Sequence, residues 1–308
     1  MVPFVRDWTT APAVFTASAA REIDALGDLH GDPDVAVRML SAAGLITKTS
    51  PFHWAGEDRI LIVTGDVIDK GTSALPIIDL FQSLEPEARA AGGAVVVLLG
   101  NHEAEFLADP HDSKSSVFQG ELASRGLDPG EVAAGSGAYG AWLSTRPVAA
   151  SIDGWFFCHA GTSAKISSST LDLKFRALFD TPASAERGRV GFGMPFLTGD
   201  DSLLEATEWW KDGAGDPRAT IDTFLNALPA THVVFGHDPG DLEFPGDTAG
   251  DRVKGQVVAR YEGRLFPIDV GMSYAVGYSS GALLRITPGS PERVAVVSAD
   301  GQSTSLWP

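Results

Sequence analysis

The chain has 308 residues, 44% of them hydrophobic, a length and composition that predict one large domain over residues 1–308. Its 23 Lys and Arg residues stand against 40 Asp and Glu residues, and the resulting net charge of −17 argues against non-specific binding to nucleic acid or an anionic membrane. The single cysteine, Cys158, excludes an intramolecular disulfide and a four-cysteine zinc site.

Short apolar runs that stop at Gly, Asp, Asn or His recur along the chain and predict strands, because each run is too short for a helix. They cover residues 22–26, 60–64, 94–99, 155–158 and 232–235. Helical stretches follow the first three runs, over residues 34–43, 73–84 and 103–108. Strand, polar turn and helix in succession predict an α/β fold whose ligands bind beyond the carboxyl ends of its strands.

The remaining segments predict a cap and a second kind of sheet. Residues 111–150 and 162–230 contain helical stretches with Gly and Pro breaks, and we expect these helical insertions to form a cap that shapes substrate access. From about Gln256 onward, short strands with turns at Glu262-Gly263 and Asp300-Gly301 predict a closing antiparallel sheet.

Each predicted strand ends at an oxygen or imidazole ligand that has glycine beside it. In chain order these side chains are Asp28 and His30, Asp66 and Asp69, Asn101 and His102, His159, and His237. Any one of these motifs alone is an ordinary turn, N-cap or satisfied histidine. Five together, each at the same kind of strand end, indicate a metal centre.

The donor types favour two divalent cations that share a carboxylate. Asp66, in the middle of the set, is the expected bridge. Asp28 and His30 are expected to hold the first metal with it, and Asn101, His159 and His237 to complete the second site. His102 is the candidate acid for the leaving oxygen, and Asp69 can orient its imidazole, although Asp69 also fits a helix N-cap.

The ordered motifs resemble the calcineurin-like metallophosphoesterases, and within them the phosphoprotein phosphatase type. The motifs are Gly27-Asp28-Leu29-His30-Gly31, Gly65-Asp66-Val67-Ile68-Asp69-Lys70-Gly71, Gly100-Asn101-His102-Glu103, His159-Ala160-Gly161 and Gly236-His237. Residues 91–103, 142–147 and 268–272 further resemble the bacterial-lineage, Shewanella-like branch. The resemblance implies a four-layer αββα sandwich, the ligand roles given above, and two divalent metal ions, with Mn²⁺ the first expectation and iron or zinc the alternatives.

Two lysines depart from the family pattern. The second motif of the family normally ends Asp-Arg-Gly, but position 70 is Lys, and Lys211 replaces the arginine of a Leu-Trp-Tyr-Arg-Asp stretch. Because those arginines grip the substrate phosphate, the resemblance implies a phosphate-binding role for Lys70 and Lys211. Lysine keeps the charge but loses the bidentate fork. For Lys211, a solvated residue beside packed tryptophans is the alternative.

These features predict a metal-dependent phosphatase that hydrolyses phosphomonoesters by direct attack of a metal-bridging hydroxide. The expected partner is a phosphorylated protein, at Ser/Thr or Tyr, or a small phosphoester, with no nucleic acid and no membrane. The alternatives are a nucleotide phosphoanhydride (dinucleoside polyphosphate) hydrolase and a catalytically silent scaffold. Since the N-terminus lacks the pattern of a secretory signal and no apolar run is long enough to span a membrane, we expect a cytoplasmic protein.

Overall fold

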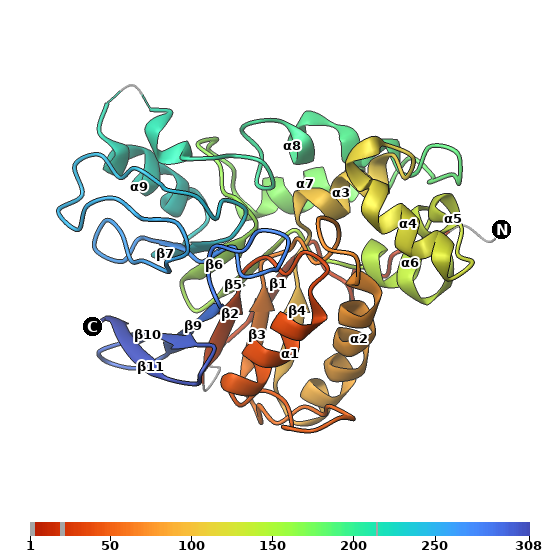
Figure 1. Cartoon of the computed structure of the whole chain (residues 1–308). Coiled ribbons are helices and arrows are strands. Elements are labelled where there is room, and N and C mark those ends of the chain that lie inside the picture. The colour runs from red at the N-terminus through yellow and green to blue at the C-terminus, as the bar shows by residue number, and fades with distance from the viewer. Residues whose placement is uncertain (1–3, 19–21, 214) are drawn as a thin grey trace.

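Two β-sheets lie at the centre of the computed structural model, which describes residues 4–18, 22–213 and 215–308 (Figure 1). One sheet has the strand order β11-β10-β9-β2-β3-β4 and the other the order β1-β5-β6-β7-β8. The strands are β1 (Val14–Ala17), β2 (Ile23–Leu26), β3 (Ile60–Val63), β4 (Ala94–Val97), β5 (Ala149–Ile152), β6 (Trp155–Cys158), β7 (His232–Phe235), β8 (Leu265–Pro267), β9 (Ala282–Thr287), β10 (Arg293–Ser298) and β11 (Ser303–Trp307).

The predicted strands β2, β3 and β4 run parallel at one side of the first sheet. Every residue of β2 and β3 is buried, as expected for strands covered on both faces. Helices α1 (Pro33–Ala42) and α2 (Ala74–Ala90) cover the outer face of these strands (Figure 1). Helix α1 begins where Pro33 fixes φ and the Asp32 side chain accepts a hydrogen bond from the Val35 amide at 3.1 Å.

The second sheet is covered in the same way by helix α9 (Pro217–Ala227). Phe224 of α9 packs edge-on against Phe156 of β6, with ring centroids 5.9 Å apart. Two sheets with helices outside each of them confirm the predicted αββα architecture.

Four elements differ from the sequence-based expectations. Helix α2 continues to Ala90, because Pro86 lies inside the helix and does not end it. Helix α3 (Asn101–Ala108) begins two residues earlier than predicted, directly at the candidate ligand Asn101. Strands β1 and β5 were not predicted: β1 is a partly exposed edge strand, and β5 lacks a long β-branched run.

The C-terminal segment also corrects one expectation. Strand β8 pairs with β7 in parallel, so the residues after Gln256 do not form a purely antiparallel sheet. Strands β9, β10 and β11 are antiparallel as predicted, with the turn at Asp300-Gly301 between the last two. Strand β9 also pairs with β2, the first predicted strand, in antiparallel orientation. The three C-terminal strands therefore extend the sheet that contains β2, β3 and β4.

The two segments predicted as insertions hold the remaining helices. These are α4 (Ser116–Ser124), α5 (Pro129–Ala133) and α6 (Gly137–Ser144) in the first, and α7 (Ser168–Ala177), α8 (Pro195–Thr198) and α9 in the second. Within the described ranges, no helix has both the length and the apolar character needed to cross a bilayer.

Candidate metal centre

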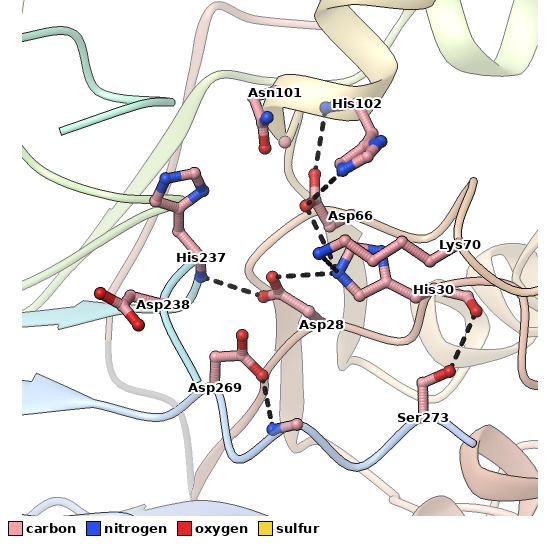
Figure 2. A network of polar contacts seen from close by, with 12 residues as sticks. Asp28, His30, Asp66, Lys70, Asn101, His102, His237, Asp238, Asp269 and Ser273 are labelled. Atoms are coloured by element: carbon pink, nitrogen blue, oxygen red, sulfur yellow. Dashed lines mark hydrogen bonds and ion pairs between the residues drawn. The ribbon is translucent and has the colours of Figure 1, made fainter. Parts of the chain in front are cut away.

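The carboxyl ends of β2, β3, β4, β6 and β7 bring all eight predicted metal-ligand and acid residues into one cluster. Figure 2 labels Asp28, His30, Asp66, Asn101, His102 and His237 of this set. Potential ligand atoms form two groups, and within each group all of them lie within 4.8 Å of one another. One group consists of His30, Asp66 and His102, and the other of Asp66, His159 and His237. Asp66 belongs to both groups, the position expected of a bridging carboxylate.

The first group is built around His30. Its Nε2 atom lies 3.8 Å from Asp28 Oδ2 and 3.7 Å from Asp66 Oδ2. Its Nδ1 atom lies 3.4 Å from the carbonyl oxygen of Ile68, which assigns the proton to Nδ1 and leaves the Nε2 lone pair facing the two carboxylates. His102 Nε2 lies 3.8 Å from Asp66 Oδ2 on the other side.

The second group is built around His159, which is fully buried. Its Nδ1 atom donates to the carbonyl oxygen of Thr64 at 2.9 Å, so that its Nε2 atom is unprotonated. That Nε2 atom lies 3.0 Å from Asn101 Oδ1, 3.4 Å from Asp66 Oδ1 and 3.2 Å from His237 Nδ1.

Several of these acceptor atoms have no hydrogen-bond donor. Buried acceptors of this kind are what a bound cation requires, so they show whether the residues fit one. Asp28 Oδ2 is buried without a hydrogen-bond partner among the described residues. Asn101 Oδ1, His159 Nε2 and Asp66 Oδ1 face one another as three acceptors. Either rotation of the Asn101 amide or a cation between the three atoms would satisfy them. Carboxylate, amide and neutral imidazole donors converging in this way fit divalent metal ions.

The backbone at the site is strained. Five non-glycine residues there adopt the left-handed conformation: His30, Asp66, Asp69, Lys70 and His237, with φ between 40° and 70°. Such conformations cost roughly 1–3 kcal/mol each and persist where the surrounding structure holds them. Backbone strain at three candidate ligands, His30, Asp66 and His237, therefore indicates that these strand-end turns form a functional site.

Glu103 holds the Asp66 turn in place. Its carboxylate accepts hydrogen bonds from the amides of Asp66, Val67, Ile68 and Gly100 at 2.8–3.0 Å. A Cβ atom on Gly100 would collide with Asp66 Oδ1, so only glycine allows this approach. The Gly100 amide caps the helix of Glu103 itself, whereas the other three amides belong to another strand end, which no local pattern reveals.

His102 and Asp69 lie beside each other as predicted. Asp69 Oδ1 accepts from the amide of Phe118 at 3.0 Å, and its Oδ2 lies 3.5 Å from His102 Nδ1. Burial opposes protonation of His102, but the Asp66 and Asp69 carboxylates outweigh it and raise the pKa of His102 to about 9. The Asp69 carboxylate therefore accepts a hydrogen bond from the first insertion and faces the His102 imidazole. It does not cap a helix that begins near it in the sequence.

The three remaining histidines of the cluster, His30, His159 and His237, are held in the neutral form. Burial lowers the pKa of His30 to about 3 and that of His237 to about 4, and it lowers the pKa of His159 as well. Neutral imidazole is the form that binds metal. The four histidines thus divide into three with ligand character and one with the character of an acid.

The two lysines occupy different surroundings. Lys70 Nζ lies 2.8 Å from His30 Nε2, within the cluster (Figure 2). Lys211 Nζ lies 2.8 Å from Glu208 Oε1 and 2.7 Å from Glu243 Oε2, in a short helical turn, η3 (Trp209–Lys211). Both lysines were predicted to bind phosphate, but only Lys70 contacts the ligand set.

Cys158 lies at the end of β6 and is fully buried. Burial raises the pKa of its thiol well above the ordinary value, which removes any nucleophilic thiolate at ordinary pH.

Comparisons with known proteins give a family and several similar proteins for this chain. A family described as calcineurin-like phosphoesterase matches residues 22–241. An uncharacterized protein of Schizosaccharomyces pombe is 28% identical over 92% of this chain and 82% of its own length. Shewanella-like protein phosphatase 2 of Arabidopsis thaliana is 38% identical over 26% of this chain and 20% of its own length. Among solved structures, a cold-active protein-tyrosine phosphatase of a psychrophilic Shewanella species superposes with a TM-score of 0.68 at 20% identity, covering 94% of this chain and 82% of that one.

Proposed function

Because the chain belongs to the calcineurin-like phosphoesterase family, we propose that it is a metal-dependent phosphatase that hydrolyses phosphomonoesters, with phosphoproteins as substrates. One observation carries this proposal: two groups of ligand atoms share Asp66, and a histidine backed by a carboxylate lies beside them. The name of the Arabidopsis relative, a protein phosphatase, supports the substrate class.

Six residues would hold the metals. Asp28, His30 and Asp66 are assigned to the first, and Asp66, Asn101, His159 and His237 to the second. Two bound divalent cations would activate water and neutralise the charge of the phosphate. We propose Mn²⁺ at both positions, with iron or zinc as alternatives, since the hard oxygen and imidazole donors accept all three.

His102 is assigned as the acid that protonates the leaving oxygen. Its Nε2 atom faces Asp66 at 3.8 Å, and its Nδ1 atom faces Asp69 at 3.5 Å. Asp69 thereby orients the ring and stabilises the imidazolium, while its other oxygen is fixed by the Phe118 amide. The phosphate itself is assigned to Lys70, which reaches the ligand set, and not to Lys211, which two glutamates hold.

The insertions at 111–150 and 162–230 are proposed to shape access to this centre within one domain, residues 1–308. The first supplies the Phe118 amide to Asp69. In the second, the Leu203 carbonyl accepts from Ala160 next to His159, and Asp201 accepts from Thr162 and Ser163. A cavity of about 450 Å³ is lined by residues of 162–166 and 195–203, and the first of these segments follows the His159 motif in the sequence.

A substrate panel tests the proposal. The purified full chain, supplied with Mn²⁺, is expected to hydrolyse an activated aryl phosphate and phosphopeptides, including Ser/Thr and Tyr forms, faster than dinucleoside polyphosphates. Metal analysis of the same sample should find two divalent ions per chain. Faster turnover of dinucleoside polyphosphates would favour a phosphoanhydride hydrolase, and failure to hydrolyse the aryl phosphate with Mn²⁺, iron or zinc would favour a silent scaffold.

A further inference from the structure

The buried carboxylate of Asp269 has no role in the assignments above. Asp269 follows β8, the neighbour of β7 in the second sheet, and is 1% exposed. It lies within the 268–272 stretch whose sequence stood out without an assigned function. A buried carboxylate at a sixth strand end therefore calls for a physical explanation.

A close backbone approach brings Asp269 to the centre. A Cβ atom on Gly27 would lie 2.8 Å from the Ile268 carbonyl oxygen and 3.0 Å from Asp269 Cα. Glycine at position 27 thus lets the end of β2 pack against the end of β8. The next residue after Gly27 is Asp28, so the two carboxylates come from adjacent pieces of backbone.

The Asp269 side chain is fixed in this position. Its Oδ1 atom accepts from the Gly271 amide at 2.9 Å, and Arg252 Nη1 donates to the Asp269 carbonyl oxygen at 3.3 Å, not to the carboxylate. Figure 2 shows the carboxyl group of Asp269 beside Asp28, on the side of the cluster away from Asn101. The loop therefore orients a carboxylate toward the first metal group.

Charge at this place is unbalanced without a divalent cation. Asp28, Asp66 and Asp269 are each 1% exposed, and so is Asp69 next to them. Asp28 Oδ2 is buried and has no hydrogen-bond partner among the described residues. Lys70 contacts His30, and the protonated His102 lies between Asp66 and Asp69, so two cations face four buried carboxylates. Neighbouring buried carboxylates destabilise one another unless cations compensate them, and this set leaves Asp28 and Asp269 without a cation of their own.

We propose that Asp269 is a positioning residue of the first metal site, which acts through Asp28 and raises the affinity of that site for a divalent cation. This role rests on the proposed function, because it requires a metal at Asp28 and His30. Removing the charge of Asp269 should therefore weaken metal binding and relieve repulsion in the metal-free protein.

Calorimetric titration of the metal-free full chain with Mn²⁺ tests this role. Asp269→Asn keeps the oxygen that accepts from Gly271 but removes the charge. We expect it to weaken one of two Mn²⁺ binding events by about tenfold, the lower range for residues that support metal ligands, and to leave the other unchanged. The metal-free variant should melt at the same temperature as wild type or higher. Asp269→Glu, which keeps the charge, should bind Mn²⁺ much closer to the wild-type affinity.

Asp238→Asn is the matched control. The Asp238 side chain, like that of Asp269, accepts a hydrogen bond from the amide two residues later, here Gly240 at 2.8 Å. Asp238 follows His237, however, on the side of the second metal site. The Asp238→Asn variant should therefore leave the Mn²⁺ affinity of the first site unchanged. Wild type that binds no divalent ion would refute the proposed function itself. Two normal binding events in Asp269→Asn, or equal weakening in Asp269→Asn and Asp269→Glu, would refute only the role of Asp269.

Discussion

The two halves of the candidate metal centre use different chemistry. The half around His30 holds the carboxylates of Asp28 and Asp269 and the ammonium of Lys70. The half around His159 consists of neutral donors, Asn101 and His237, and shares the carboxylate of Asp66 with the first half. The first half should therefore hold its cation mainly through charge, and the second should leave its cation more electrophilic toward phosphate.

Asp66→Asn should cause the largest loss, because it removes the one charge that both halves share. We expect the rate of phosphoester hydrolysis to fall by at least about 10³-fold, which corresponds to roughly 4 kcal/mol of transition-state stabilisation. Metal analysis should find fewer than two ions per chain. Asp238→Asn is the control for loss of a carboxylate nearby. Full occupancy and full activity in Asp66→Asn would show that the halves are independent.

His102→Asn tests a residue that borders the first half without belonging to its ligands. Turnover of an alkyl phosphate should fall by about 10²–10³-fold, since a poor leaving group needs the proton that His102 supplies. An activated aryl phosphate should lose far less. His53→Asn, which removes an exposed histidine paired with Glu87, should change neither rate. Equal losses for both substrates would contradict the assignment of His102 as the acid.

The division between the halves follows in part from the sequence. The candidate ligands could be predicted because each stands within two residues of a glycine after a short apolar run, as Asp28 and His159 do. Their convergence could be predicted because carboxyl ends of parallel strands meet at one edge, and the structure places β2, β3 and β4 accordingly.

The supporting residues could not be predicted in the same way. Glu103 binds amides about 36 residues earlier in the chain, and Asp269 approaches Asp28 through a contact between backbone segments more than 240 residues apart. The contacts of Glu103 depend on the pairing of β3 with β4, and the approach of Asp269 depends on how the two sheets pack; no local periodicity encodes either. The short Trp-rich match around Lys211 predicts a phosphate-binding residue type, but it does not determine the direction of the side chain, which lies between Glu208 and Glu243 in the structure.

Lys70→Met tests the one cation of the first half. At saturating Mn²⁺ we expect kcat/KM for an aryl phosphate to fall by about tenfold, since a hydrogen bond from a charged group contributes roughly 1.5 kcal/mol or more. Lys70→Arg should keep or raise kcat/KM, because the guanidinium can grip phosphate through two bonds. Wild-type kinetics in Lys70→Met would remove Lys70 from the phosphate site and weaken the charge difference between the halves.

Lys211→Met should have the smallest effect. The variant tests whether the contacts of Lys211 in the fold or its sequence resemblance to a phosphate-binding arginine better predicts its role. Lys211 pairs with Glu208 and with Glu243, whose side chain is 72% exposed, and exposed ion pairs contribute only about 0–1 kcal/mol. We therefore expect kcat/KM to change by less than about twofold, with any loss appearing as a slightly lower melting temperature. The double variant Lys70→Met/Lys211→Met should then lose no more activity than Lys70→Met alone, because the two lysines share no partner. A tenfold loss in Lys211→Met, or a double variant far worse than Lys70→Met, would mean that Lys211 leaves its glutamates to bind phosphate when substrate is present.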